Sequence, residues 1–137
     1  MDSLFDTRLS LLQKSLDLRS ARNNLLASNI ANAETPGYKA RDLVFEKALG
    51  EAMQSQTPGP LQVTDRRHLD GRQPLPVEMV NGEMIQSGNP VGSLDDNSVN
   101  LETEMAKLGE NQVSYNALTR MMNYKFNLLK TVLSQGD

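Results

Sequence analysis

The sequence predicts a mainly α-helical protein whose long N- and C-terminal helices pair as a coiled coil, with a short helix and a Pro/Gly-rich, partly disordered or β-hairpin segment between them. Residues 4–34 and 101–134 carry apolar residues at alternating three- and four-residue steps, the spacing of an amphipathic helix. Residues 54–98 instead hold five of the six prolines, a residue that helix interiors and central strands exclude. Only 38% of the 137 residues are hydrophobic and 4% aromatic, so little material is available for a large self-contained core.

The first helix is expected over residues 4–34, with Ser3 as its N-cap. Leucines follow one another at heptad spacing, and further apolar residues flank them. The resulting apolar stripe is wider than a two-stranded coiled coil needs, so part of it is expected to meet other subunits. The heptad leucines are Leu4, Leu11, Leu18 and Leu25, and Ile30 ends the flanking series.

A turn signal marks the end of this helix. Pro36 disfavours the helical conformation at Thr35, and Gly37 can adopt the positive φ that a type II turn requires. Asn29 and Asn32 precede the turn, and their spacing leaves two alternatives open. Their amides either satisfy the backbone locally at the helix end or hydrogen-bond across a helix interface and fix its register.

The second helix is expected over residues 101–134, capped by Asn100. Its side chains form a heptad series, a second series that alternates with it and contains two polar residues, and an extra apolar flank. The heptad series is Leu101, Leu108, Tyr115, Met122 and Leu129; the second is Met105, Gln112, Thr119, Phe126 and Leu133; the flank is Leu118, Met121, Leu128 and Val132. The candidate assembly interface of both helices comprises Leu11, Leu18, Leu25, Ile30, Leu108, Tyr115, Leu118, Met122, Phe126 and Leu129.

The two ends are expected to form one discontinuous unit, residues 1–38 and 99–137, with residues 39–98 as a mobile middle segment. Proline and glycine are frequent in this middle, and a structureless stretch of such length suits an insertion between paired helices better than a compact domain.

Two local signals stand out within the middle segment. A short helix is expected at about 43–53 after Asp42 as its cap, because apolar residues recur there at helical spacing, namely Phe45, Leu49 and Met53. Asn81-Gly82 favours a tight turn between two short apolar runs, so a hairpin is expected at about 77–86.

Neither the composition nor the motifs of the chain indicate a catalytic, metal-binding or cofactor-binding site. A formal charge of −3 argues against a nucleic-acid partner or an anionic membrane, and the absence of cysteine removes thiolate chemistry. His68 is the one histidine, in a sequence typical of a solvated loop. No catalytic site, metal site, cofactor or small-molecule substrate is expected, and the chain is not expected to be an enzyme. The N-terminus also lacks the pattern of a cleaved signal peptide, so export would use another route.

Residues 24–38 resemble the N-terminal signature of bacterial flagellar rod and hook proteins. The residues that carry the signature are Asn29, Ile30, Asn32, Thr35, Pro36, Gly37 and Tyr38. Residues 38–43 and 97–105 resemble the proximal rod members of this group. The short chain agrees, because hook and distal-rod relatives carry larger middle domains.

The resemblance implies a structural subunit of the proximal rod in the flagellar basal body. Such a subunit polymerises through its terminal helices into the drive shaft that transmits torque from the MS ring. The resemblance further implies export from the cytoplasm to the periplasmic space through the flagellar type III apparatus without a cleaved signal peptide. The implied partners are other copies of the chain, the rod protein FlgC, further rod subunits and the adaptor FliE near the MS ring.

Phe45 and Leu49 also resemble the short Phe-x-x-x-apolar export-gate motif of rod and hook subunits. Phe5 and Leu9 match the same pattern. Two apolar residues on one face of a short helix would also produce it, without any role in export.

A cytoplasmic coiled-coil adaptor or chaperone that binds one helical partner is the alternative function. It would form a finite oligomer and would not cross a membrane, so cell fractionation separates the two hypotheses.

Overall fold

The computed structural model describes residues 2–55, 77–86 and 96–134 of the chain. The elements are α1 (Asp2–Ala31), β1 (Arg41–Val44), α2 (Glu46–Ser55), the short 3-10 helix η1 (Val77–Met79), β2 (Glu83–Gln86) and α3 (Leu101–Ser134). The expected mainly helical fold with two long terminal helices is confirmed.

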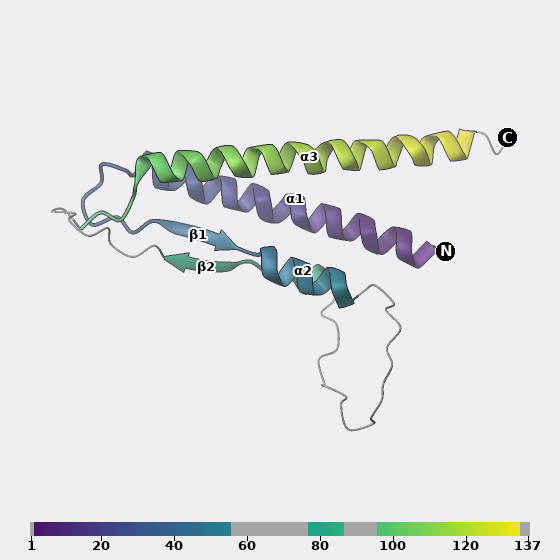
Figure 1. Cartoon of the computed structure of the whole chain (residues 1–137), viewed down its shortest axis with the longest axis horizontal. Helices are drawn as coiled ribbons and strands as arrows, with labels where there is room; N and C mark the ends of the chain where they lie inside the picture. Colours follow the sequence, from purple (N-terminus) through teal and green to yellow (C-terminus); the bar gives the residue numbers. More distant parts are fainter. Residues whose placement is uncertain (1, 56–76, 87–95, 135–137) are drawn as a thin grey trace, which may run out of the picture.

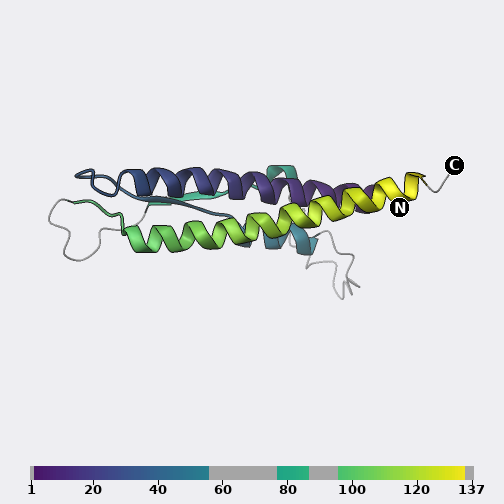
Figure 2. The same ribbon diagram turned by 90° about the horizontal axis from the view of Figure 1, so that it is seen from above.

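The two long helices lie side by side and run in opposite directions, so both chain ends lie at the same end of the molecule (Figures 1 and 2). The strands β1 and β2 and the helix α2 lie along α1 on the side away from α3 (Figure 1). Helix α1 is therefore the central layer, and α3 is the outer one.

The predicted cap of α3 and the predicted turn after α1 are present, whereas Ser3, the expected cap of α1, lies inside that helix. The Thr103 amide donates to Oδ1 of Asn100 over 2.9 Å, which makes Asn100 the N-cap of α3. Gly37 has φ 72°, and the Tyr38 amide donates to the Thr35 carbonyl over 3.2 Å. Pro36 then occupies the second position of a turn whose third position needs a positive φ, as the sequence predicts for a type II turn.

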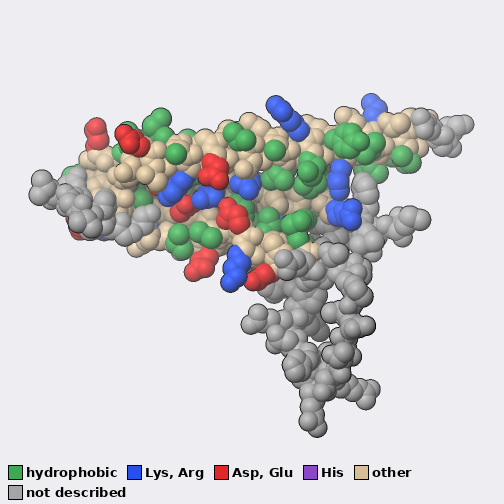
Figure 3. All heavy atoms as spheres, in the orientation of Figure 1, with side chains coloured by type: hydrophobic (Ala, Val, Ile, Leu, Met, Phe, Trp, Pro, Cys, Tyr) green, Lys and Arg blue, Asp and Glu red, His purple; other side chains and the backbone are tan. Residues whose placement is uncertain are grey.

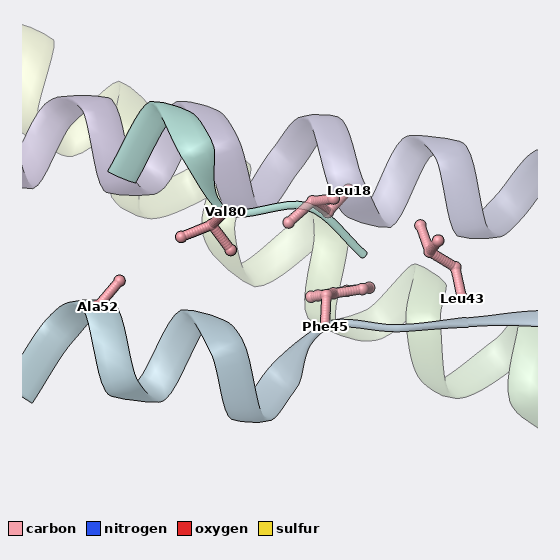
Figure 4. Packing of buried hydrophobic residues seen from close by; sticks show 5 residues of the cluster. All are labelled: Leu18, Leu43, Phe45, Ala52 and Val80. Carbon is pink, nitrogen blue, oxygen red and sulfur yellow. The ribbon is translucent and has the colours of Figure 1, made fainter. Parts of the chain in front are cut away.

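The hydrophobic core lies between α1 and the middle segment (Figure 4). Its buried members are Leu18, Leu43, Phe45, Ala52 and Val80, with Leu25, Ala48 and Leu49 packed against them. The apolar cluster therefore crosses the boundary expected at residue 38.

The predicted short helix begins later than expected. Residues 41–44 form β1, and α2 begins at Glu46. Asp42 is not a helix cap, because its carboxylate accepts from the Arg22 guanidinium at 2.8 and 3.0 Å. Extended backbone at this point lets Leu43 reach the core while β1 pairs with β2.

The middle segment contains the antiparallel strand pair that the fold class included, but the expected local hairpin at 77–86 is wrong. Strand β2 pairs with β1, in a register that places Arg41 opposite Gln86 and Val44 opposite Glu83. Val77–Met79 forms η1 instead of a strand. Val77 and Val80 are both 2% exposed, and the three-residue turn of a 3-10 helix puts both on the buried face, whereas strand alternation would separate them.

Of residues 39–98, the segment expected to be mobile, residues 56–76 and 87–95 lie outside the described residues, as does His68. Among the helices that the structure describes, none combines the length and apolar character needed to cross a membrane.

Candidate functional site

The covered side of α3 contains the predicted heptad series from Leu108 to Leu129 but not the predicted second series. Buried and half-buried residues recur at alternating four- and three-residue steps, namely Glu104, Leu108, Asn111, Tyr115, Leu118, Met122, Lys125 and Leu129. The predicted alternating series at 105, 112, 119, 126 and 133 is exposed except for half-buried Thr119. The two fully buried side chains on α3, Glu104 and Asn111, are polar. Sequence periodicity missed them because it scores apolar residues.

Asn111 fixes the position of α3 on α1 through its amide. The side chain is 1% exposed. Its Nδ2 donates to the Arg19 carbonyl over 2.8 Å and to Oδ1 of Asn23 over 2.9 Å, while its Oδ1 accepts from Nη1 of Arg19 over 3.1 Å. Asn23 in turn donates to Oε1 of Gln112 over 3.2 Å. A shift of one helix along the other would leave these buried groups unpaired, so the network specifies a single register.

Asn29 makes a second polar layer nearer the turn. Its Nδ2 donates to Oε2 of Glu104 over 2.7 Å and to the Arg41 carbonyl over 2.7 Å. The Arg41 amide returns a hydrogen bond to Oδ1 of Asn29 over 3.1 Å. Asn32 instead donates to the Ser28 carbonyl of its own helix over 2.8 Å. Of the two alternatives for this asparagine pair, the cross-helix role belongs to Asn29 and the local role to Asn32.

A group of charged side chains joins α1, β1 and α3 (Figure 3). Arg22 holds Asp42 through two hydrogen bonds, Lys107 lies 3.5 Å from Asp42, and Nζ of Lys107 lies 2.9 Å from Oε1 of Glu104. The hydrogen bond to Asp42 raises the pKa of Arg22. Burial pushes the pKa of Asp42 up, but the Arg22 hydrogen bond and charge outweigh burial and leave it below its ordinary value.

Asn97 clamps the end of α1 from a distant part of the chain, and residue-pattern reasoning missed this role. Its Nδ2 lies 3.1, 2.8 and 2.8 Å from the carbonyl oxygens of Asn32, Ala33 and Thr35, and its Oδ1 accepts from the Val99 amide over 2.7 Å. The last carbonyls of a helix have no partner within the helix. The Asn32 and Thr35 carbonyls also accept from the Thr35 and Tyr38 amides, so this general need of helix ends indicated a partner without identifying Asn97.

The neighbour of Asn97 extends this junction. The Ser98 amide donates to the Tyr38 carbonyl over 3.0 Å, and Oγ of Ser98 accepts from the Ala40 amide over 2.8 Å. The segment that leads into α3 is thus hydrogen-bonded to the segment that leaves α1.

The signature residues therefore build a junction between the two helices. Asn29 is buried, Ile30, Asn32 and Tyr38 are half-buried, and the turn residues Thr35, Pro36 and Gly37 are exposed. The Tyr38 hydroxyl lies 3.4 Å from Oδ1 of Asn29.

The candidate interface residues lie mostly on surface that the chain already covers. Leu18 is buried in the core; Leu11, Leu25, Ile30, Leu108, Tyr115, Leu118, Met122 and Leu129 are half-buried. Phe126 is 51% exposed. Other apolar side chains of α3 are also exposed, namely Val113, Met121, Tyr124, Leu128, Val132 and Leu133, and Figure 3 shows apolar side chains along the C-terminal half of this helix. The role of these residues in assembly stays a prediction.

Phe45 and Leu49, the candidate export motif, belong to the folded core. Phe45 is 1% exposed, and Leu49 packs against the same cluster. The Arg19 guanidinium carbon lies 5.5 Å from the centre of the Phe45 ring, close enough for a cation–π contact.

The hydrogen-bond networks described above can hold α1 and α3 in a single register. Among the described residues, no group of three or more His, Cys, Asp or Glu side chains is arranged to hold a metal ion. The polar contacts join α1, α3 and the middle segment to one another.

Comparisons with known proteins identify the family. Residues 9–39 match the family described as "Flagella basal body rod protein". The chain is 35% identical to the flagellar basal body rod protein FlgB of Bacillus subtilis over 136 residues, which cover 98% of each chain. It is 36% identical to FlgB of Cereibacter sphaeroides over 94% of this chain and 95% of that one, and 32% identical to FlgB of Proteus mirabilis over 90% and 91%.

The chain belongs to the FlgB family of flagellar basal body rod proteins. This is a family of structural proteins, and its members associate with other components of the rod. The family match spans most of α1 and the turn that follows it, so it covers the junction described above.

Proposed function

We propose that the chain is a subunit of the proximal rod, which polymerises through its terminal helices and transmits torque from the MS ring. The single observation that supports this role best is the similarity to FlgB proteins over nearly the whole of both chains. The subunit would act in the periplasmic part of the basal body.

The exposed apolar side chains of α3 support polymerisation as the mode of action. Met121, Phe126 and Leu128 are 53%, 51% and 48% exposed. Full burial of such a side chain contributes roughly 1.5–3 kcal/mol. A shaft under torque needs extended interfaces, and a helix of 34 residues presents one about 50 Å long.

The partners proposed for this surface are other copies of the chain, FlgC, further rod subunits and FliE near the MS ring. No nucleic acid or small-molecule substrate is part of the proposal. Association with several neighbours is consistent with apolar residues that remain exposed on α3 after α1 has covered its own side.

Export is proposed to precede folding, through the flagellar type III apparatus and without a cleaved signal peptide. Phe45 is 1% exposed in the folded chain, so a gate can read Phe45 and Leu49 only in an unfolded segment. The motif and the core would then use the same side chains at different times.

Introducing a negative charge at exposed apolar positions of α3 tests the assembly proposal. We expect Phe126→Glu and Leu128→Glu to abolish motility and recovery in basal bodies, while the variant chains still fold. Asn123→Glu places the same charge on an exposed polar site of the same helix and should leave both unchanged. Normal motility of both apolar variants would refute the proposal, and a wild-type chain confined to the cytosol would favour an adaptor instead.

A matched pair of core variants tests the export motif. Phe45→Ala and Leu43→Ala both remove a buried member of the same cluster, but only the first changes the motif. We expect Phe45→Ala to lower the amount of exported chain well below that of Leu43→Ala. Equal export of the two variants would show that the apparatus does not read Phe45.

A further inference from the structure

The link between η1 and β2 contains a solvent-exposed asparagine, Asn81. This residue lies outside any helix or strand. The next residue is Gly82, which has no Cβ to hinder an approach to its backbone nitrogen. Asn81-Gly82 does not form the turn of a local hairpin, because β2 pairs with β1.

We propose that Asn81 is a site of spontaneous deamidation in the folded chain. The backbone nitrogen of Gly82 loses its proton and attacks Cγ of Asn81. The bond from Cγ to Nδ2 breaks, ammonia leaves, and a succinimide ring remains. Water then opens the ring at either carbonyl, which yields aspartate or isoaspartate at position 81.

The structure singles out Asn81 by contrast with Asn97. Asn97 is also followed by a small residue, Ser98, but it is 5% exposed and its Nδ2 faces three carbonyl oxygens. Those contacts hold its side chain away from the Ser98 nitrogen, which itself donates to the Tyr38 carbonyl. In the described part of the chain, no hydrogen bond restrains the Asn81 side chain in this way.

The modification would disturb the packing beneath it. Isoaspartate adds one carbon to the main chain between buried Val80 and strand β2. A Cβ placed on Gly82 would lie 2.6 Å from Cγ and Cδ1 of Leu43, so the backbone there has no room to move toward the core. The extra length is therefore expected to displace the link toward solvent and to weaken the pairing of β2 with β1. The new carboxylate also lies two residues from Glu83.

Peptide mass spectrometry on the aged full-length chain tests the proposal. After incubation at slightly alkaline pH and body temperature, we expect the peptide containing Asn81 to gain the mass of an NH2-to-OH exchange several-fold faster than that containing Asn97. A protein-isoaspartate methyltransferase should label the aged wild-type chain, and Asn81→Gln should abolish most of that label, because glutamine closes the larger ring far more slowly. In urea Asn81 should still convert faster, because Gly82 lacks the Cβ that Ser98 has, but the ratio of the two rates should be smaller than in the folded chain.

Two results would overturn the proposal. One is an unchanged Asn81 in the folded chain under conditions that convert it in urea. The other is a ratio of Asn81 to Asn97 conversion that is no larger in the folded chain than in urea, which would show that burial and hydrogen bonding do not select the site.

Discussion

Replacement of Asn97 is expected to release α3 from the end of α1. The Asn97 amide carries two hydrogens for three carbonyl oxygens, so it makes about two full hydrogen bonds, and its Oδ1 accepts a third from the Val99 amide. Each such bond contributes roughly 0.5–1.5 kcal/mol net. Asn97→Ala should therefore lower the free energy of unfolding by about 3 kcal/mol.

Asn97→Asp gives a sharper version of the same experiment. Aspartate keeps the shape and the acceptor for Val99, but it turns a carboxylate oxygen toward three carbonyl oxygens. Repulsion then replaces attraction, so this variant should be less stable than Asn97→Ala at neutral pH.

Urea unfolding followed by far-UV circular dichroism measures both variants. Asn123→Ala, at an exposed position of α3, serves as the control and should stay within about 0.5 kcal/mol of wild type. An Asn97→Ala chain as stable as the control, or an Asn97→Asp chain more stable than Asn97→Ala, would refute the clamp.

Three further predictions address the core, the charged group and the polar layer. Gly82→Ala should destabilise the chain by about 1–3 kcal/mol because its Cβ would collide with Leu43. Gly50→Ala in α2, where nothing lies within 4 Å of the added Cβ, should stabilise it by about 0.5–1 kcal/mol. Thermal unfolding of the two variants measures both effects. Because the pKa of Asp42 is lowered in the folded chain, its stabilisation is complete above its unfolded pKa of about 3.9 and is lost as pH falls through the folded value. The free energy of unfolding should therefore drop less with acid in Asp42→Asn than in wild type. Asn111→Ala should cost about 3 kcal/mol for three lost hydrogen bonds and raise amide exchange in the middle of α3; unchanged exchange there would contradict the register role.

The helices and the turn after α1 were predictable because their signals are local. Residues 4–34 and 101–134 matched α1 and α3 within a few residues, and the second boundary coincided because Asn100 is a true cap. The type II turn likewise depends on Pro36 and Gly37 alone. Each of these features is determined by residues that are neighbours in the sequence.

The strand pair and the polar layers were not predictable from pattern, because their partners are far apart in the chain. Strand β1 looked like the start of a helix, and only its pairing with β2 some forty residues later explains its extended backbone. Asn29 and Glu104 are separated by 75 positions. Both residues are polar, so hydrophobic periodicity does not detect them. Their hydrogen bond stabilises the fold only when both residues are present.

The side of α3 that α1 covers carries both polar and apolar side chains. Two of the positions that α1 covers hold the polar residues Glu104 and Asn111. Buried polar pairs add little net stability compared with apolar packing, but they tolerate a single alignment. Pairing within the chain thus combines apolar contacts with matched hydrogen bonds, while Met121, Phe126 and Leu128 stay outside it. One helix thus holds a fixed register inside the subunit and still leaves apolar side chains exposed, which the proposed assembly would cover.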